Sequence, residues 1–530
     1  MDPQEYFESI CQAMNEPSFY PHPVSGLRRV ETHISVVFLT GEWVYKLKKP
    51  VDLGFLDFRK LEDRRRFCEL EISLNRRLSQ GVYLEVVTIH ENDGRGFSLK
   101  NKGPVAEYAV KMRQLPEERS LAELLRNKKV RKNDIRKLAR TLAAFYEESG
   151  RSPQIDQYGR QEIISTNMEE NFQQLEPFRD EVLTSDDWDF ICEVSRSFLK
   201  KHQDLFNHRL AAGKIRDGHG DLRAEHIYLF EGIQIIDCVE FIDRFRYGDV
   251  VLDLAFLHMD LEHLGYSEWS RTFLSEYVAI SHDFKLYALL DFYAAYRATV
   301  RLKVTCFRLD GVKGEERRAI LKEAKSFFHL TYRYALQFTR PTLWVFCGLP
   351  ATGKSALARE VAGALSIPIL QSDRIRKAGH PSAPEEVVPY GRGSYSLGMR
   401  QIIYERMFGQ AYETLGSGQS VILDATFSRR KWRDEARRLA RDLNANLIFV
   451  ETDCQEETIR SRLKAREKKT GFSDVRLENY QQIVESFEPL TGFEMDHHIS
   501  VDTDQLLLDA AAYVLSEGYA RICAQVEKIL

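Results

Sequence analysis

Short runs of hydrophobic residues alternate with polar positions in the first part of the chain. Two runs rich in β-branched and aromatic residues lie on either side of the tripeptide TGE within residues 33–48, which is the pattern of a β-hairpin. Residues 59–79 carry apolar side chains at roughly helical spacing and charged side chains on the other faces, so they predict a helix. Residues 84–90 and 107–115 have the composition of further strands. We therefore expect a small β-rich lobe with one early helix over residues 1–115.

From residue 116 to about 335 the spacing of the apolar residues is mostly helical. The exceptions are HGDLRAEHIYLF at 219–230 and the buried strand pattern of GIQIIDCVEF at 232–241. An apolar strand, a glycine-rich turn and a helix follow within residues 340–365, and strands alternate with helices after them, which is typical of a parallel α/β domain. The pattern predicts a first domain at 1–338, with a large lobe at 116–338, and a second domain at 339–530.

Composition and charge narrow the possible partners. The chain has 530 residues, 43% of them hydrophobic and 29% charged, with a formal net charge of −4. This balance gives no global attraction to nucleic acid or to an anionic membrane. The eight cysteines are scattered, no stretch reads as a membrane span, and the N-terminus lacks the pattern of a secretory signal. We expect a cytoplasmic protein with free thiols and no membrane partner, whose oligomeric state the sequence does not indicate.

The most specific motif is GLPATGKS at 348–355, which matches G-x-x-x-x-G-K-[ST] between an apolar strand and a helix. Glycines let successive backbone N–H groups and the helix N-terminus face phosphate oxygens. Lys354 is expected to reach the β- and γ-phosphates of ATP, and Ser355 to ligate Mg²⁺. A glycine turn without a nucleotide is the weaker alternative, because strand and helix flank the motif correctly. The expected ATP-binding residues of this loop are Gly348, Leu349, Pro350, Ala351, Thr352, Gly353, Lys354 and Ser355.

Two acidic residues follow strands of the same domain. Asp424 ends an apolar strand and is a candidate metal ligand, with a helix cap or turn as its alternative role. Asp373 follows another strand, at the edge where open α/β sheets bind ligands. An Asp at this place in a small kinase can accept the proton of a substrate hydroxyl, while Arg374 and Arg376 hold an anionic substrate. A capping role for Asp373 stays open.

Arginines offer further contacts to phosphate in this domain. Arg462 and Arg466 lie four residues apart on one helical face and are candidate ATP-binding residues that neutralise the transferring phosphoryl group. A solvated basic helix is the alternative. The basic stretch at 429–441 has the same alternative, and Arg433 is its candidate for a nucleotide or substrate contact.

The motifs of the second domain resemble those of the zeta-toxin and gluconate-kinase group of P-loop kinases. The resemblance rests on the P-loop with SDRIRK (372–377), LDATF (423–427) and RSRLKAR (460–466), and it covers most of residues 341–500. It implies a kinase, and it does not fix the substrate.

The first domain contains the skeleton of a kinase site. In HGDLRAEH the His and Asp221 stand as in a protein-kinase catalytic loop, and Asp237 ends the next apolar strand, where a kinase carries its metal-binding Asp. Upstream, Lys46 and Lys48 alternate onto one strand face, where they are candidates for contacts to the α- and β-phosphates of ATP. Glu71, in the predicted helix, is the natural ion-pair partner for one of them.

These residues resemble the aminoglycoside-phosphotransferase-like kinases, through HGDL, IIDCVEF and DLAFL. Residues 31–58 and the order of the two domains resemble a bacterial fusion family in which such a kinase domain precedes a P-loop ATPase. The resemblance implies an α+β, protein-kinase-like, two-lobed domain followed by an α/β P-loop domain with a parallel sheet. By this resemblance Asp221 is the catalytic base, Asp237 a metal ligand, and Asp253 a structural support of the loop.

One position departs from the kinase pattern: His226 stands where the metal-binding Asn is usual. Imidazole is a poor ligand for Mg²⁺ and a fair one for Mn²⁺. His226 is therefore a metal ligand, an orienting residue beside the metal, or a structural histidine. Glu240 is a candidate for the missing oxygen ligand. Before the lysine strand no G-x-G-x-x-G is present, so phosphate cover has to come from LTGEW at 39–43.

A basic group in the large lobe bears on the substrate. Arg297 and Arg301 lie four residues apart with Lys303 close by. If they line the cleft, they favour an acidic or phosphorylated acceptor over a cationic aminoglycoside. Salt bridges with nearby acids are the alternative.

The sequence thus predicts an enzyme with two sites, each transferring the γ-phosphoryl group of ATP to a hydroxyl of a small, sugar-like or anionic metabolite. ATP and Mg²⁺ are the expected cofactors, with Mn²⁺ an option in the first domain. Two other functions stay open. The first domain can be a ligand sensor that controls a P-loop ATPase, or the second can be a nucleic-acid end kinase.

Overall fold

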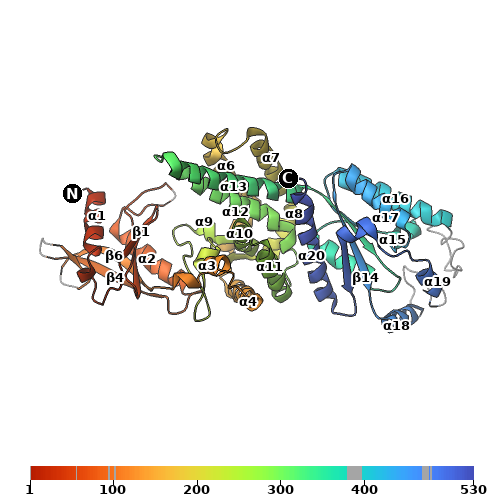
Figure 1. Cartoon of the computed structure of the whole chain (residues 1–530), viewed down its shortest axis with the longest axis horizontal. Coiled ribbons are helices and arrows are strands. Elements are labelled where there is room, and N and C mark those ends of the chain that lie inside the picture. The colour runs from red at the N-terminus through yellow and green to blue at the C-terminus, as the bar shows by residue number, and fades with distance from the viewer. Residues whose placement is uncertain are drawn as a thin grey trace. The chain divides into compact units, whose positions relative to one another are not determined.

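The computed structural model describes residues 2–54, 56–92, 96–100, 103–378, 397–467, 477 and 480–530. Its N-terminal part is built on an antiparallel sheet with the strand order β1-β2-β3-β6-β4-β5 (Figure 1). The predicted hairpin at 33–48 is confirmed as the pair β2 and β3. The strands are β1 (Arg28–Glu31), β2 (Ser35–Leu39), β3 (Trp43–Lys48), β4 (Tyr83–Glu91), β5 (Phe97–Ser98) and β6 (Val105–Arg113).

One helix covers each face of this sheet. Helix α1 (Pro3–Met14), which the sequence pattern did not reveal, packs on the face that carries Tyr45 and Leu47. Helix α2 (Leu61–Asn75), the predicted early helix, packs on the face that carries Val44. Because side chains alternate along a strand, Lys46 and Lys48 lie on the α2 face, beneath that helix.

The next part of the chain is helical, as predicted, with two short strand pairs around the loop that begins at His219. Strand β7 (Ile215–Asp217) pairs with β10 (Tyr247–Asp249), and β8 (Ile227–Leu229) pairs with β9 (Ile233–Ile235). The helices are α3 (Leu121–Arg126), α4 (Lys132–Glu148), α5 (Pro153–Asp156), α6 (Gln161–Leu175), α7 (Ser185–Lys201), α8 (Gln203–Ala211), α9 (Asp243–Arg246), α10 (Val250–His263), α11 (Ser267–Ser281), α12 (Leu286–Phe307) and α13 (Gly314–Thr339).

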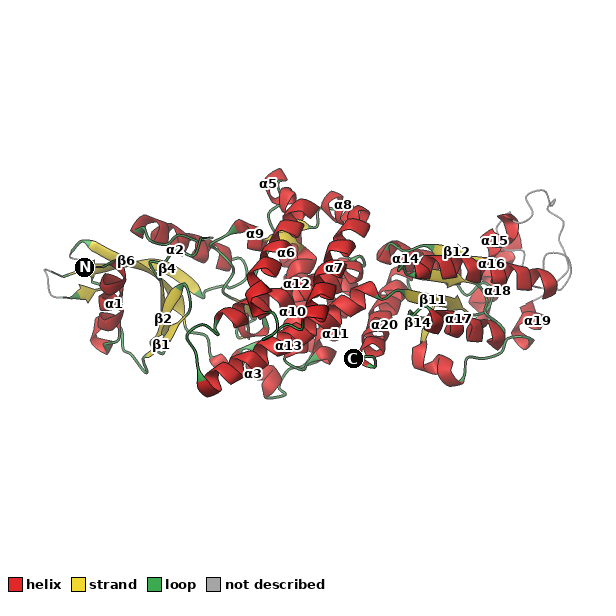
Figure 2. Cartoon of the chain, turned by 90° about the horizontal axis from the view of Figure 1, so that it is seen from above, coloured by secondary structure: helices red, strands yellow, loops and turns green. Residues whose placement is uncertain are grey.

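The C-terminal part is the expected parallel α/β domain, with the strand order β12-β13-β11-β14-β15 (Figure 2). Its strands are β11 (Thr342–Cys347), β12 (Ile369–Gln371), β13 (Val421–Asp424), β14 (Asn446–Asp453) and β15 (His498–Asp502). Its helices are α14 (Lys354–Leu365), α15 (Ser372–Ala378), α16 (Leu397–Gly416), α17 (Arg430–Asp442), α18 (Glu456–Glu467), α19 (Tyr480–Glu485) and α20 (Leu507–Glu527). The central strand β11 is buried along its whole length, with Leu343, Val345 and Cys347 facing α16 and α17.

Packing groups the chain into two compact units, residues 1–166 with 206–273, and residues 167–205 with 274–530. The second unit joins helices α12 and α13 to the P-loop domain. Within it, the hydroxyl of Tyr519 donates to Asp291 Oδ1 at 2.6 Å, and Lys285 Nζ donates to the Gly363 carbonyl at 2.6 Å. The predicted boundary at 338–339 falls at the end of α13, inside this unit, and stays a prediction. In the described part of the chain no helix has the length and apolar character that a membrane crossing requires.

The buried Tyr519–Asp291 hydrogen bond is expected to stabilise the second unit. Tyr519→Phe removes the donor from a buried carboxylate oxygen, so we expect the free energy of unfolding of this unit to fall by about 1–3 kcal/mol. Tyr513→Phe on the same helix is the matched control, because its side chain is exposed, and it should change stability by less than about 0.5 kcal/mol. Scanning calorimetry of both variants measures the difference. Equal transitions for the two variants would contradict the expected role of the bond.

Candidate active sites

A buried network of opposite charges joins strand β3 to helix α2 in the first unit. Lys46 Nζ lies 2.8 Å from Glu71 Oε1 and 2.6 Å from Asp237 Oδ1. Lys48 Nζ lies 2.8 Å from Glu71 Oε2 and also pairs with Glu240. The Glu71 partnership expected with one lysine therefore exists with both. The network places the amine of Lys46 directly beside the carboxylate of Asp237.

The charges in this network hold one another ionised. Burial opposes protonation of Lys46, but Asp237 and Glu71 together raise its pKa well above the usual value. Burial likewise opposes ionisation of Asp237, but Lys46 holds the pKa of that carboxyl well below its usual range. Glu240 behaves differently, because burial raises its pKa more than Lys48 lowers it. At neutral pH, Lys46 and Asp237 therefore face each other as a charged pair.

Hydrogen bonds to Asp253 on α10 hold the loop that carries Asp221. The Asp253 carboxylate accepts from the N–H of His219 at 2.6 Å and from the N–H of Gly220 at 2.9 Å, which confirms its expected supporting role. Gly220 has φ +87°, and a Cβ atom there would lie 2.9 Å from the Phe245 carbonyl oxygen. Only glycine fits this position without strain. The backbone before Asp221 is therefore fixed on both sides.

His219 completes the support of the loop in its neutral form. Its Nδ1 accepts from the N–H of Asp221 at 3.3 Å, so Nε2 carries the proton and donates to the Ile236 carbonyl at 3.0 Å. Burial lowers the pKa of His219 to about 4. The ring thus links the Asp221 loop to the segment just before Asp237.

This depressed pKa predicts a loss of stability in mild acid. Unfolded histidine takes up a proton near pH 6.5, whereas folded His219 resists protonation down to about pH 4, so unfolding is increasingly favoured as the pH falls through that window. The difference corresponds to about 3 kcal/mol. His219→Gln keeps one donor and one acceptor without titrating, so the Gln variant should lose part of the slope of unfolding midpoint against pH between 6.5 and 4.5. Parallel slopes for the two proteins would exclude His219 as the source.

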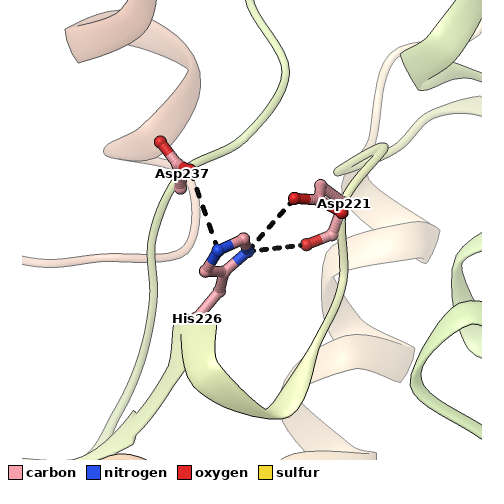
Figure 3. Close-up of side chains that lie close together, drawn as sticks. All are labelled: Asp221, His226 and Asp237. Carbon is pink, nitrogen blue, oxygen red and sulfur yellow. Dashed lines mark hydrogen bonds and ion pairs between the residues drawn. The ribbon is translucent and has the colours of Figure 1, made fainter. Parts of the chain in front are cut away.

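Asp221, His226 and Asp237 converge in one cluster of potential ligands (Figure 3). One donor atom of each residue lies within 4.8 Å of the others. His226 Nδ1 is 2.9 Å from the Asp221 carbonyl oxygen, and Nε2 is 3.7 Å from Asp237 Oδ2. Two carboxylates and an imidazole fit a divalent cation. The backbone of Asp237 also has φ 65°, which is uncommon for residues other than glycine. Such backbone conformations are often found at functional sites.

Glu240 lies outside this cluster. Its carboxylate is 4% exposed and pairs with Lys48, three residues beyond Asp237. The buried amine of Lys48 takes this second carboxylate in addition to Glu71. A role of Glu240 as the missing oxygen ligand stays a prediction.

Arg223 is a residue of this site that the sequence reasoning missed. Its Nε and Nη2 lie 3.0 and 3.1 Å from the two carboxylate oxygens of Asp221, and Nη1 pairs with Glu225. Burial opposes ionisation of Asp221, but Arg223 lowers its pKa to about 2. The available signal was a basic residue two positions after Asp221. The bidentate contact with Arg223 keeps Asp221 ionised at neutral pH.

In the second unit, the P-loop connects β11 to α14 as the motif predicts. Gly348 has φ +125°, and a Cβ atom there would lie 2.6 Å from the Thr452 carbonyl oxygen. Lys354, the first residue of α14, has its Nζ 3.5 Å from the carbonyl oxygens of Gly348 and Leu349. The lysine thus lies over its own loop, at the N-terminus of a helix that favours anions.

The two predicted acids lie at the same edge of the sheet as the P-loop. Asp424 ends β13, stands in register with Phe346 of β11, and accepts from Gln371 Nε2 at 2.8 Å. Asp373 opens α15 and lies 3.3 Å from Arg376 Nη2. Burial raises the pKa of Asp373, and Arg376 partly offsets this effect. A carboxyl with a raised pKa beside a P-loop is suited to exchange a proton with a substrate.

Arg462 lies against the P-loop, as a phosphate-binding arginine would require. Its Nη1 donates to the Ala351 carbonyl at 3.2 Å, and its Nη2 donates to the Thr503 carbonyl at 3.0 Å. The Thr503 hydroxyl in turn donates to the Thr352 carbonyl at 2.5 Å, a support that sequence reasoning missed. Arg466 lies in α18, and its side chain is outside the described residues.

Arg433 has a structural role, and the prediction that it contacts nucleotide or substrate is wrong. Its side chain is fully buried and pairs with Glu494, which is buried as well. It also donates to the Phe427 carbonyl at 2.7 Å and to the Pro489 carbonyl at 3.1 Å. With these partners the guanidinium ties α17 to the segment before β15.

Removing Arg433 should destabilise the P-loop domain strongly. Arg433→Ala leaves the Glu494 carboxylate buried without its partner, which typically costs about 3–5 kcal/mol. Arg438→Ala, on the same helix with a mostly exposed side chain, should cost less than about 0.5 kcal/mol. Thermal unfolding of the two variants provides the comparison, and a small effect of Arg433→Ala would refute the structural role.

The basic group on α12 contacts side chains of the helical region. Arg297 is 4% exposed, and its guanidinium lies over the ring of Tyr296. Arg301 lies over the ring of Phe327 on α13, and Lys303 Nζ donates to Asn171 Oδ1 at 2.6 Å. Arg297 is buried among helices, and its role as a substrate residue stays a prediction. A substrate role of Arg301 stays a prediction.

The fold and the two sites define a protein in which a protein-kinase-like domain precedes a P-loop domain. The model of the family described as AAA domain matches residues 343–490. Over 468 aligned residues the chain is 33% identical to an uncharacterized protein of Mycobacterium tuberculosis. The aligned region covers 85% of this chain and 89% of the mycobacterial protein. The chain therefore belongs to the family of that mycobacterial protein.

Among the solved structures, two show limited likenesses to this chain. A choline/ethanolamine kinase family protein from Mesorhizobium loti is 14% identical, covers 61% of this chain and 98% of its own, and has a TM-score of 0.37. A gluconokinase from Sinorhizobium meliloti is 20% identical, covers 36% of this chain and 98% of its own, and has a TM-score of 0.26. Both TM-scores are low, and neither likeness decides an activity or a substrate.

Proposed function

We propose that the chain is an ATP-dependent phosphotransferase with two separate sites, each acting on a hydroxyl group of a small metabolite. The first site is proposed because Asp237 lies beside the amine of Lys46 and shares a cluster of potential metal ligands with Asp221. For the second site it is the complete P-loop, with Asp424 and Asp373 at the same sheet edge. All eight cysteines are free thiols, which supports a cytoplasmic location.

In the first site Asp221 orients the acceptor hydroxyl and receives its proton. The acceptor oxygen forms a bond to the γ-phosphorus while the bond from that phosphorus to the leaving oxygen of ADP breaks. The amine of Lys46 holds phosphate oxygens of the nucleotide, and Glu71 keeps that amine in place. Asp237 and its neighbours would hold a divalent cation, which would neutralise more of the phosphate charge.

In the second site the P-loop N–H groups and Lys354 hold the phosphates, and Asp373 takes the proton of the acceptor. Ser355 and Asp424 are the residues that would hold Mg²⁺. Arg462 lies close enough to the loop to face the transferring group. Arg376, which is bound to Asp373, stays a candidate for an anionic acceptor.

The bidentate contact of Arg223 with Asp221 favours a second candidate function. In this function the first domain senses a ligand without turnover and controls the P-loop domain. A carboxylate with both oxygens engaged is a weaker proton acceptor. The acceptor has to displace or share this contact for Asp221 to act as base.

One experiment separates these functions. ATP labelled at the γ-phosphate is incubated with the full chain and a fractionated extract of small metabolites, and the wild type is compared with Asp221→Asn and Lys354→Ala. Two labelled products, each abolished by one substitution, support two phosphotransferase sites and identify both acceptors. A single product that depends on Lys354 and not on Asp221 would support the sensing domain instead.

A further inference from the structure

The imidazole of His226 presents one nitrogen to the cluster of the first site. Its Nδ1 is 2.9 Å from the Asp221 carbonyl oxygen, which can only accept, so Nδ1 carries the proton. Its Nε2 is 3.3 Å from Arg223 Nη2, which can only donate, so Nε2 bears the lone pair. That lone pair faces Asp237 Oδ2 at 3.7 Å (Figure 3). The ring is thus in the tautomer that leaves Nε2 able to bind a metal ion.

The position of this ring is fixed by its own backbone. His226 ends the short 3₁₀ turn Ala224–His226, and its carbonyl accepts from the N–H of Ile236 at 3.0 Å. The side chain is buried. A hydrogen bond from the second ring nitrogen to a backbone carbonyl is the usual way in which proteins orient a metal-binding histidine. His226 is therefore held between Asp221 and Asp237 before any ion arrives.

The spacing of the donor atoms suits one shared ion. Two ligand atoms that are each about 2.1 Å from the same ion lie roughly 3–4 Å apart. The 3.7 Å between His226 Nε2 and Asp237 Oδ2 falls in this interval. The Asp221 carboxylate lies at the other ring nitrogen, with Oδ2 3.6 Å from Nδ1. Mg²⁺ takes oxygen ligands, whereas imidazole nitrogen suits Mn²⁺ and the later transition metals.

We propose that the first site binds a divalent transition-metal ion of the Mn²⁺ class in preference to Mg²⁺, with Nε2 of His226 and the carboxylate of Asp237 as direct ligands. This inference rests on the proposed function, in which the site holds a nucleotide with a divalent cation. The guanidinium of Arg223 occupies the same side of Nε2, so the ion has to displace that one contact. Arg223 retains Glu225 as a partner when it does so.

The test is a Mn²⁺ titration of the full chain followed by electron paramagnetic resonance. The chain carries Lys354→Ala, so that the P-loop takes no nucleotide, and the β,γ-methylene analogue of ATP is present. We expect one bound Mn²⁺ whose pulsed spectrum shows coupling to an imidazole nitrogen. In His226→Asn, which offers an oxygen in place of the nitrogen, this coupling should disappear, and the ratio of Mn²⁺ to Mg²⁺ affinity should fall about tenfold or more.

Absence of nitrogen coupling in the protein with His226 intact would overturn the inference, and this readout needs no variant to fold. An unchanged affinity ratio in a folded His226→Asn protein, with folding checked by its thermal transition, would overturn it as well. Either failure is distinguishable from a failure of the proposed function. Phosphoryl transfer that depends on Asp221 and proceeds with Mg²⁺ would leave the function standing without this metal preference.

Discussion

Replacing Lys354 by Ala should abolish transfer at the P-loop site and leave transfer at the first site intact. The amine lies 3.5 Å from two carbonyl oxygens of the loop, at the N-terminus of α14, where it is positioned to hold the β- and γ-phosphates. Loss of one such charge contact typically lowers kcat by about 10²–10³-fold. The labelled product of the second site, measured by its initial rate, reports the change.

The control for this result is Lys464→Ala, which removes an exposed amine from α18 in the same domain. It should leave both rates unchanged. A Lys354→Ala protein that still makes the second product at the wild-type rate would show that the P-loop does not bind the reacting nucleotide.

Replacing Asp221 by Asn should abolish transfer at the first site with little effect on nucleotide binding. The amide cannot take up the proton of the acceptor, and general-base catalysis typically contributes about 10²–10⁴-fold to the rate. Asp221 touches Arg223 and His226, while Lys46 and Glu71 form the contacts expected to hold the nucleotide. We therefore expect kcat to fall and the affinity for an ATP analogue to stay within about threefold.

Glu148→Gln, an exposed carboxylate at the end of α4, is the matched acid-to-amide control. It should behave as the wild type. An Asp221→Asn protein with normal kcat would contradict the role of Asp221 as base and would favour the ligand-sensing alternative.

The sequence predicts those elements that depend on the periodicity and turn residues of a single segment. The β2–β3 hairpin, helix α2 and the strand, turn and helix of the P-loop follow from periodicity and turn residues, and the structure contains all of them. The alternation of Lys46 and Lys48 also placed both amines on one strand face, where Glu71 meets them. Helix α1 was missed, and its packing on the sheet depends on residues far away in sequence.

The sequence says least about charged residues on helices. It makes Arg433 and Arg297 candidates for ligand contacts, because charge spacing does not reveal which face of a helix is buried. The structure buries both, Arg433 with Glu494 and Arg297 against the ring of Tyr296. The pairing of Glu240 with Lys48 depends on how the segment after Asp237 packs against β3, which no pattern in the sequence shows. The contact of Arg223 with Asp221 is local, and the basic residue two positions after Asp221 was its signal.

The central claim is that one chain holds two nucleotide sites of different construction. The most direct test is the number of ATP-analogue molecules bound per full-length chain, measured by equilibrium titration with a divalent cation present. We predict two for the wild type, one for Lys354→Ala, and one for a variant that carries Lys46→Ala with Asp237→Asn. A wild-type value of one, lost entirely in Lys354→Ala, would contradict the claim and leave the P-loop as the single nucleotide site.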